Sequence, residues 1–438
     1  MTRVPAAVAA ALLVLATSPV RAEITEAQLD QAARANMPQV ITWRRDFHQH
    51  PELGNSETRT AKVVAEQLKS LGLEVRTGVA HTGVVGILKG GKPGPVVALR
   101  ADMDALPVTE QVDLPFKSTV TAEYNGAKVG VMHACGHDSH TAILMGTATA
   151  LASMRQELPG TVVFVFQPAE EGTPDGTRGG AYLMLEEGIF DAPKPDAAFG
   201  LHVFSTLNTG KIGYRSGPFM AAADRFRIVV KGEQTHGSRP WGGVDPIVAS
   251  SQIIMGLQTL VSRQIDITRN PAVVTVGAIK GGIRNNIIPD QVEMIGTFRT
   301  FDPAVRQQII DGITRTSKDI AASSGASAEV EIGDDNYPVT VNDEKLTERM
   351  LPSLERAAGP GNVIEIPYVT GAEDFSFFGQ RVPSLYFFVG ITPVGQDASR
   401  APSNHSPKFF IDEGGIELGL RAMLGVTVDY LQGSGQRK

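Results

Sequence analysis

Hydrophobic positions in the first half of the chain alternate between helical and strand-like spacing. From about Thr25 to Thr77 the apolar residues, among them Ile41 and Phe47, recur at helical intervals, and Gly72 ends the second helical run. Strand-like apolar runs then cover residues 83–88, 96–100 and 161–166, and a helical run covers residues 140–154. Strands that alternate with helices predict a layered α/β domain whose mixed sheet is mainly parallel.

The order of elements changes near Arg215. Strand-like runs cover residues 226–230, 272–279, 291–299 and 328–332, and helical spacing covers residues 245–261 and 303–322. This order, β-α-β-β-α-β, is typical of the ferredoxin-like arrangement, a compact unit of about 100 residues. After Asn336 the earlier pattern resumes with a helix over 343–358, a strand over 384–389 and a last helix from Glu413. A smaller α+β domain is therefore expected to be inserted in the α/β domain.

The first 22 residues have the three parts of a secretory signal peptide. Arg3 gives a short basic start, residues 6–16 are apolar, and residues 20–22 (VRA) form a small-residue cleavage site. The apolar run is shorter than the roughly 20 residues that span a bilayer; the alternative is an uncleaved apolar helix. The protein is therefore expected to be periplasmic or secreted. Its expected organisation is a signal peptide over 1–22, a catalytic domain over 23–215 and 334–438, and an inserted domain over 216–333.

Composition and charge disfavour some classes of function. The chain has 438 residues, of which 42 % are hydrophobic and 20 % charged, as in ordinary folded soluble proteins. Its 40 basic and 47 acidic residues give a net charge of −7 without a long run of one sign, which disfavours binding to nucleic acids or anionic membranes. The only cysteine, Cys135, cannot form an intramolecular disulfide. In an exported protein such a thiol is expected to be buried or held by a metal.

The candidate chemistry centres on residues 133–140. This segment, HACGHDSH, holds three of the nine histidines, the cysteine and an aspartate. Cys135 and His137 are two positions apart with a glycine between them, so both side chains can reach one cation, and a thiolate with an imidazole suits zinc. A single histidine is more often structural, but several ligand types in one short segment favour a metal site.

Carboxylates follow two of the apolar strands. Asp102 and Asp104 end one strand and point to the same side, and the carboxyl ends of parallel strands are where α/β sheets bind ligands. Glu170 and Glu171 follow another strand, and one of them can bind a metal while the other acts as a general base toward water. The alternatives are a solvated strand end and an exposed glutamate pair.

Two isolated histidines extend the candidate metal set. His202 ends an apolar stretch and His405 lies in a loop, and each alone is weak support for a site. Together with Cys135, His137 and a glutamate they give five ligands, which are too many for one catalytic zinc and suit two ions about 3.5–4 Å apart. The chain has neither a Gly-x-Ser-x-Gly elbow nor a His-Glu-x-x-His helix, so those hydrolase templates do not apply.

As an ordered set, these segments resemble the M20 metallopeptidase family. The chain is similar to the subgroup of amidohydrolases that includes hippurate hydrolases, N-acyl-amino-acid deacylases and plant auxin-conjugate hydrolases. The resemblance rests on residues 48–53 (HQHPEL), 100–107 (RADMDALP), 133–140 (HACGHDSH), 167–171 (QPAEE), 200–202 (GLH), 236–240 (HGSRP), 286–289 (NIIP), 296–299 (GTFR), 371–375 (GAEDF) and 405–407 (HSP). It therefore covers nearly all of the chain after the signal peptide.

The resemblance implies a role for each candidate residue. Two divalent cations, zinc or manganese with cobalt or nickel as alternatives, would be bound by Cys135, His137, Glu171, His202 and His405. Glu170 would be the general base. The wider family has a metal-binding histidine two residues before its active-site aspartate, where this chain has Asp102 before Asp104. Asp104 is the expected catalytic aspartate, but the roles of both aspartates stay open and include orienting the metal ligands.

By the same resemblance the inserted domain is a lid and a dimerisation domain. His236 would polarise the scissile carbonyl across the interface of a homodimer. Asn286 and Arg299 would hold the substrate carboxylate, for which the bidentate guanidinium is suited. The ordinary alternatives are a turn for His236, a loop hydrogen bond for Asn286 and a surface ion pair for Arg299.

The expected function is metal-dependent hydrolysis of the amide bond of N-acyl amino acids, aroyl or acetyl, which releases a carboxylic acid and a free amino acid. A metallo-carboxypeptidase or dipeptidase is the alternative in the same fold, because both reactions hydrolyse an amide. A non-catalytic periplasmic protein that binds metal or amino acids is the alternative of another class. Glu170 disfavours it, since metal binding alone needs no free carboxylate beside the site. The acyl group and the native metal stay open, and neither a nucleic-acid partner nor membrane attachment after signal cleavage is expected.

Overall fold

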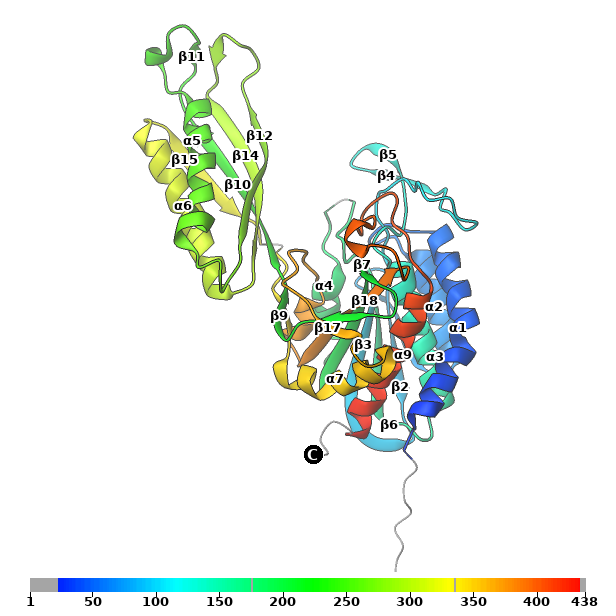
Figure 1. The fold of residues 1–438 in the computed structure, drawn as a ribbon. Helices are drawn as coiled ribbons and strands as arrows, with labels where there is room; N and C mark the ends of the chain where they lie inside the picture. Colours follow the sequence, from blue (N-terminus) through cyan, green and yellow to red (C-terminus); the bar gives the residue numbers. More distant parts are fainter. Residues whose placement is uncertain (1–22, 175, 335, 434–438) are drawn as a thin grey trace, which may run out of the picture.

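Two β-sheets of different size organise the chain (Figure 1). The computed structural model describes residues 23–174, 176–334 and 336–433, so the predicted signal peptide lies outside the described residues. The larger sheet has eight strands in the order β1-β2-β6-β3-β7-β18-β8-β17. Its strands are β1 (Glu74–Val79), β2 (Gly83–Lys89), β3 (Lys92–Asp102), β6 (Pro159–Gln167), β7 (Ala197–Asn208), β8 (Ile212–Tyr214), β17 (Val363–Glu365) and β18 (Ser384–Thr392).

The four central strands of this sheet, β6, β3, β7 and β18, run parallel, and antiparallel pairing joins β2 and β8 to them. Parallel strands are covered by helices on both faces, which explains why these segments are near-continuous apolar runs in the sequence. In β3, for example, Val97 and Leu99 face one core and Ala98 faces the other, as the two-residue repeat of a strand requires. The predicted α/β fold with a mixed sheet is confirmed.

Helices form a layer on each face of the larger sheet. The first layer holds α1 (Glu26–Gln49), α2 (Thr58–Ser70), α3 (His137–Ser153), α7 (Glu344–Ala358) and α9 (Gly414–Gln432). The second layer holds the short helices α4 (Gly180–Glu186) and α8 (Ser376–Gly379). Because α1 packs over both α3 and α9, those two helices are buried on nearly all sides, in agreement with their largely apolar sequences.

The smaller sheet has four antiparallel strands in the order β12-β14-β10-β15. Its elements in chain order are β10 (Ala222–Lys231), α5 (Pro246–Thr259), β12 (Val273–Gly281), β14 (Gln291–Thr300), α6 (Pro303–Ser323) and β15 (Ser327–Ile332). Asp245 and Asp302 cap the two helices by accepting hydrogen bonds from first-turn amides, and a proline begins each helix. The β-α-β-β-α-β order is therefore observed, and in Figure 1 this unit stands apart from the larger sheet. The domain boundaries stay predictions.

The remaining elements are short. Two-stranded sheets are formed by β4 (Thr121–Tyr124) with β5 (Ala127–Gly130), β9 (Gly217–Met220) with β16 (Thr340–Asn342), and β11 (Thr235–His236) with β13 (Ile287–Ile288). Short 3₁₀ or π turns cover Pro240–Gly242, Leu260–Gln264 and Ala398–Arg400. β9, which pairs with β16, lies where the chain passes between the larger and the smaller sheet (Figure 1). Of the helices in the described part of the chain, none combines the length and apolarity that a membrane crossing requires.

Some local predictions differ from the structure. The helical pattern predicted to Thr77 ends at Ser70, and the next residues form β1, an edge strand with mostly polar, exposed side chains that give little strand signal. The helix predicted over 140–154 begins at His137, because polar residues of its first turn point into the protein rather than to solvent. Each difference therefore arises where tertiary position overrides the local hydrophobic pattern.

Candidate metal centre

The candidate site lies at the carboxyl end of the central parallel strands. The segment that follows β6 carries Glu170 and Glu171, and β7 carries His202. A cavity of about 1150 Å³ opens there, and its wall includes these three residues together with Cys135 and His405. The topology thus brings segments that are far apart in the sequence to the edge of the sheet where α/β proteins bind ligands.

The turn before α3 places Cys135 and His137 on the same side. Gly136 between them has φ +102°, in the left-handed region that favours glycine, and a Cβ atom there would overlap a methyl group of Val203. His137 is the first residue of α3. Glycine therefore lets the chain turn tightly enough for the thiol and the imidazole to approach one point, as the sequence predicts.

The five predicted metal ligands come together around the thiol. Ligand atoms of Cys135, His137 and His202 lie within 4.8 Å of one another, as do those of Cys135, Glu171 and His405. The Cys135 Sγ atom is 3.3 Å from His202 Nε2 and 3.2 Å from His405 Nε2. His405 Nε2 is 2.7 Å from Glu171 Oε1. The thiol thus belongs to both groups of ligand atoms, an arrangement that suits two neighbouring cations.

His405 reaches the site on a loop that Asn404 fixes. His405 has φ +73°, which is uncommon for a residue other than glycine, and its amide donates to the Ala134 carbonyl at 2.8 Å. The Asn404 side-chain amide donates to the carbonyls of Cys135 at 2.9 Å and Val203 at 3.1 Å. The loop is therefore tied both to the turn before α3 and to β7.

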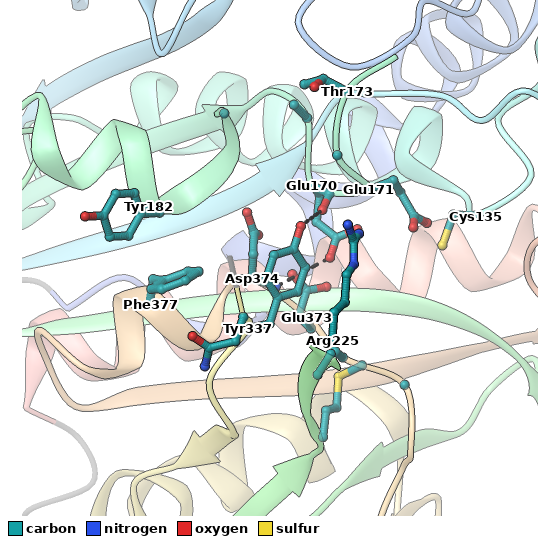
Figure 2. Close-up of a pocket in the computed structure, with 18 of the residues that line it drawn as sticks. Cys135, Glu170, Glu171, Thr173, Tyr182, Arg225, Tyr337, Glu373, Asp374 and Phe377 are labelled. Atoms are coloured by element: carbon teal, nitrogen blue, oxygen red, sulfur yellow. Dashed lines mark hydrogen bonds between the residues drawn. The ribbon is translucent and has the colours of Figure 1, made fainter. Parts of the chain in front are cut away.

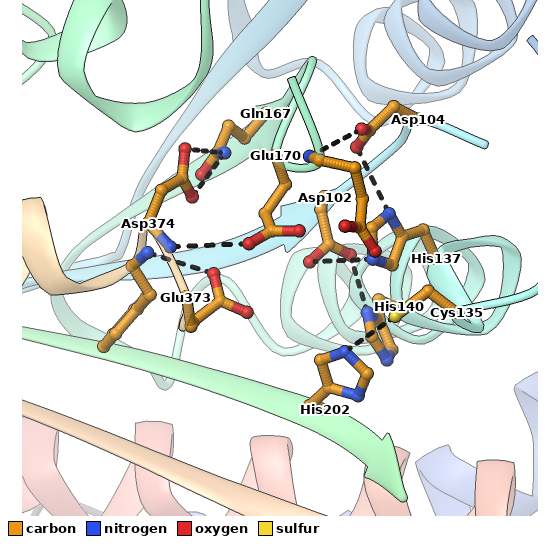
Figure 3. Close-up of polar contacts among 12 residues, drawn as sticks. Asp102, Asp104, Cys135, His137, His140, Gln167, Glu170, His202, Glu373 and Asp374 are labelled. Atoms are coloured by element: carbon orange, nitrogen blue, oxygen red, sulfur yellow. Dashed lines mark hydrogen bonds and ion pairs between the residues drawn. The ribbon is translucent and has the colours of Figure 1, made fainter. Parts of the chain in front are cut away.

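Asp102 and Asp104 lie behind the histidines. Asp104 Oδ1 is 3.2 Å from His137 Nδ1, and Asp102 Oδ1 is 2.6 Å from His140 Nδ1 (Figure 3). His140 Nε2 also accepts a hydrogen bond from the Val203 amide at 2.9 Å, so both of its ring nitrogens are engaged. Both aspartates are placed to orient imidazole rings, and Asp104, predicted as the catalytic aspartate, is buried outside the cavity wall.

The protonation states around the thiol differ between the candidate ligands. Burial and the nearby glutamates raise the pKa of the Cys135 thiol well above its usual value, so a thiolate here needs a positive charge beside it. Burial, with His140 close by, lowers the pKa of His202 and keeps that ring neutral, as a ligand must be. Although burial lowers it, the charges of Asp102 and Asp104 raise the pKa of His137 to about 10, so a cation would have to displace a proton from this ring, whose buried Nε2 atom has no hydrogen bond to any residue in the described ranges. These donors fit a thiolate, imidazole and carboxylate metal site.

Glu170 is a buried carboxyl in acidic surroundings. Only 5 % of the residue is exposed, and burial together with the charges of Glu373 and Glu171 raises its pKa well above the usual value. Its Oε1 atom accepts a hydrogen bond from the Asp374 amide at 3.4 Å. A carboxyl whose pKa is raised can exchange a proton with a reacting group, which is the role predicted for Glu170.

A buried arginine connects these acidic residues to the histidines. The Arg100 guanidinium lies 2.7 Å from Asp102, 2.8 Å from Glu373 and 2.9 Å from Asp374. Gln167 Nε2 donates to both carboxylate oxygens of Asp374, at 2.7 and 2.8 Å (Figure 3). Apart from Asp102, none of these residues was assigned a role from the sequence, although each lies in a segment that carries the family resemblance, and that placement was the available signal.

Arginine and aromatic side chains line the cavity farther from the thiol. Arg299 on β14, predicted to hold a carboxylate, lines it, and so does Arg225 on β10, which was not predicted because charges at alternate strand positions resemble a solvated face. The rings of Tyr182 and Tyr337 lie edge-on to Phe377, and their centroids are 5.4 and 6.2 Å, respectively, from the Phe377 centroid (Figure 2). The cavity therefore offers both cationic and apolar contacts to a ligand.

His236 and Asn286 are not brought to this cavity within one chain. His236 lies on β11 and is exposed, with its Nδ1 atom 2.8 Å from the Ser238 hydroxyl. Neither His236 nor Asn286 lines the cavity. Asn286 lies beside it, since its carbonyl accepts a hydrogen bond from the Gly237 amide at 2.9 Å. Figure 1 shows β11 at the end of the smaller unit that is remote from the larger sheet. Both residues are therefore close to each other and far from Glu170.

Comparison with known proteins agrees with this geometry. The sequence model of peptidase family M20/M25/M40 matches residues 98–427. The chain is 43 % identical over 392 residues to thermostable carboxypeptidase 2 of Saccharolobus solfataricus, covering 89 % of this chain and 95 % of that protein. It is 38 % identical over 403 residues to N-acetylcysteine deacetylase of Bacillus subtilis, covering 92 % and 99 %.

A solved structure shares the whole fold. The crystal structure of the Bacillus subtilis YXEP protein, described as a dinuclear metal-binding peptidase from the M20 family, is similar with a TM-score of 0.75 and 36 % identity. The match covers 91 % of this chain and 99 % of that one. The likeness therefore extends over both sheets and is not confined to the metal-ligand segments.

Proposed function

The chain belongs to peptidase family M20/M25/M40, and we propose that it uses two divalent cations to hydrolyse the amide bond of N-acyl amino acids to a carboxylic acid and a free amino acid. Its family and relatives make it a metal-dependent amidohydrolase. One observation carries the proposal: five candidate ligands converge around Cys135, and the buried Glu170 lies beside them in one cavity.

Two divalent cations would be held by Cys135, His137, Glu171, His202 and His405. Such cations, when bound, act as Lewis acids toward a carbonyl oxygen and lower the pKa of water. The thiolate and the imidazoles favour zinc, whereas a carboxylate also suits manganese, cobalt or nickel. We expect zinc or manganese, with cobalt or nickel as alternatives.

Glu170 would move the proton in both halves of the reaction. It takes a proton from the attacking water, whose oxygen bonds to the carbonyl carbon. It then gives that proton to the departing nitrogen as the carbon–nitrogen bond breaks, so a carboxylic acid and an amino acid are released. Arg100 balances the charges of Glu373 and Asp374, which flank Glu170.

The cavity suits a small substrate with one anionic and one apolar end. Arg299 lines the cavity and would bind the carboxylate of the amino acid. The Tyr182, Tyr337 and Phe377 rings offer a surface on which an acyl group would pack. A volume of about 1150 Å³ is more than an acetyl amino acid needs, so larger acyl groups are admitted as well.

A carboxypeptidase is the second candidate. The relative of 43 % identity carries that name, whereas the deacetylase relative is 38 % identical. Both enzymes hydrolyse an amide bond next to a free carboxylate, and the same metal ligands and Glu170 would catalyse either reaction. The groups beyond the scissile bond therefore distinguish the two candidates.

A homodimer formed by the smaller unit would complete the site. β12 is an edge strand of its sheet, and Val273 and Ile279 on it are exposed, as are Val248 and Met255 on α5. An unpaired edge strand beside exposed apolar side chains favours self-association. In such a dimer His236 of one chain would reach the scissile carbonyl bound by its partner.

Export to the periplasm or outside the cell is proposed from the first 22 residues. Their basic, apolar and small-residue parts are those of a cleaved signal peptide. Expression of the full chain should yield a mature protein that begins near Glu23, which intact-mass spectrometry measures directly. Retention of residues 1–22 would contradict it.

The decisive assay follows amino-acid release by the mature chain, loaded with zinc or manganese, from hippurate, N-acetyl amino acids and dipeptides. We expect turnover of the acyl amino acids. Glu170→Gln should lower kcat by about 10³-fold, since a general base contributes on that order, and should leave the metal content unchanged. The matched control is Glu123→Gln, at an exposed glutamate of β4. Cleavage of dipeptides alone would favour the peptidase, and no turnover with any metal would contradict both.

A further inference from the structure

Hydrogen bonds from other parts of the chain fix the backbone of residues 169–171, which include the candidate base Glu170. The Ala169 amide donates to Glu57 Oε1 at 2.8 Å, and the Glu171 amide donates to Asp104 Oδ2 at 2.9 Å. Between them, the Glu170 carbonyl accepts a hydrogen bond from the Tyr337 hydroxyl at 2.6 Å. The segment is thus fixed by side chains from three separate parts of the chain.

This fixation matters because the backbone conformation is unfavourable and determines where the glutamates point. Ala169 has φ +48°, in the left-handed region, which is unfavourable for a residue other than glycine. The turn directs Glu171 toward Cys135 and His405, and it directs Glu170 toward Glu373 and Asp374 (Figure 2). Loosening the turn would therefore separate the candidate base from the candidate ligands.

Tyr337 differs from the other two anchors in its position in the fold. Glu57 and Asp104 belong to the larger unit, whereas Tyr337 lies between β15 and β16, where the chain returns from the smaller sheet. Its backbone pairs with Ala223 of β10 through two hydrogen bonds of 3.0 and 3.1 Å. Tyr337 therefore connects the junction of the two units to the turn that carries Glu170.

The Tyr337 hydroxyl is suited to this contact. The ring lies edge-on to Phe377, which limits its movement. Burial, together with the nearby carboxylates of Asp374 and Glu170, raises the pKa of Tyr337, so the hydroxyl keeps its proton and remains a donor. A donor at this point satisfies the Glu170 carbonyl inside the cavity, where an unpaired carbonyl would be unfavourable.

We propose that Tyr337 is a positioning residue: by holding the Glu170 carbonyl, it keeps the candidate base oriented and links its orientation to the junction with the smaller unit. The inference rests on the proposed function in one respect, that Glu170 is the base. The hydrogen bond itself can be tested without any assay of activity.

The test is Tyr337→Phe, which removes only the hydroxyl. A misplaced catalytic group costs about 10- to 100-fold in rate, so kcat on the best acyl amino acid should fall by about tenfold or more, with KM and metal content unchanged. Hydrogen exchange at the amides of residues 169–171 should be faster, by about threefold or more, while exchange in α3 stays the same. Tyr368→Phe is the matched control, because the Tyr368 ring packs on Arg215 and Phe301 and its hydroxyl has no hydrogen bond within the described residues.

The two readouts separate failure of this inference from failure of the proposed function. If the wild-type chain turns over no acyl amino acid but exchange at residues 169–171 rises in Tyr337→Phe alone, the positioning contact stands and the proposed function fails. Unchanged exchange and unchanged kcat in Tyr337→Phe would overturn the inference. So would a rise in KM or a loss of metal in place of a fall in kcat, since those results indicate a binding or purely structural role.

Discussion

Cys135 lies between two imidazole rings, and its thiol belongs to two groups of potential ligands, one with His137 and His202 and one with Glu171 and His405. Burial and the neighbouring carboxylates oppose its ionisation, so without a cation beside it the group is a neutral, buried thiol. A pair of cations would reverse that balance. The proposed metal centre would therefore give the lone cysteine of the sequence a role beyond packing.

Replacing this thiol should weaken metal binding more than it weakens the fold. Cys135→Ser keeps the shape but provides a poorer ligand for zinc, so affinity for at least one ion should fall by about tenfold or more. Metal content after dialysis against buffered zinc measures this directly. With cobalt, the thiolate-to-metal absorption band of the wild type should disappear. His50→Ser, which removes an exposed imidazole, is the control, and equal metal content in all three proteins would exclude Cys135 as a ligand.

Glu57 should make stability depend on pH. Burial and the charge of Asp104 raise the pKa of this carboxyl to about 8. The folded chain therefore keeps the proton over a range in which the unfolded chain has lost it. The protonated Glu57 contributes fully to stability at pH values below the pKa that this carboxyl has in the unfolded chain. The contribution is lost as the pH rises through about 8. Glu57→Gln carries no such proton.

Thermal unfolding of metal-free wild type and Glu57→Gln between pH 5 and pH 9 checks this expectation. The Tm of the wild type should fall relative to that of the variant across this range, by about 2 °C if the linkage amounts to about 2 kcal/mol, because unfolding a chain of this length carries an entropy of about 0.9 kcal/mol/K. All other titrating groups are common to both chains and cancel in the difference. Two parallel curves would mean that Glu57 is ionised in the folded protein.

The sequence indicated the candidate ligands more completely than the residues that orient them. Cys135, His137 and His202 belong to residue types with few roles, so their occurrence beside other potential ligands is informative in itself. Tyr337 and Arg225 gave no such signal, because a tyrosine and an exposed arginine occur in many environments. These two residues matter because the fold places them in the wall of the cavity. The spacing of residues along the chain does not predict that placement.

Packing between two loops of the larger unit supports the turn that carries the glutamates. Gly54 lies so close to this turn that a Cβ atom would overlap the Gly172 carbonyl oxygen and crowd Ala169. Gly54→Ala should therefore displace the turn, with a loss of stability of about 2 kcal/mol and a fall in kcat. Thermal unfolding and the acyl-amino-acid assay measure the two effects.

The control for this substitution is Gly425→Ala in α9. There the nearest atom to an added Cβ is 3.6 Å away, an ordinary contact, and alanine favours the helix over glycine by about 1 kcal/mol. Gly425→Ala should be neutral or slightly stabilising with normal kcat. If both variants behave alike, the close approach at Gly54 does not control the turn.

Elements were predictable where one hydrophobic pattern dominates. β6 and β18 are buried on both faces and appear in the sequence as short apolar runs, and α6 shows a clear helical repeat between its cap Asp302 and its end. β1 was missed because an exposed edge strand has little apolar content. The order of strands in the larger sheet depends on contacts between distant segments, so the local pattern predicted a layered sheet but not which strands are neighbours.

The arrangement of the two units leaves one chain without the predicted carbonyl-polarising group near its own base. Glu170 lies in the cavity of the larger unit, while His236 is on β11 at the remote end of the smaller one (Figure 1). A second copy of the chain, associated through the exposed face of α5 and β12, would bring its own β11 to this cavity. The proposed dimer is therefore part of the proposed mechanism and not a separate property.

Mixing two inactive variants tests this arrangement. His236→Ala and Glu170→Gln should each be nearly inactive alone, but in a heterodimer the Glu170 of the first chain would meet the His236 of the second. Random association gives one intact site in half of the dimers, so co-expressed chains should recover about a quarter of the wild-type kcat. Differently tagged chains allow the heterodimer to be purified, and sedimentation measures its size. A purified heterodimer without activity would place His236 outside the reaction or restrict it to its own chain.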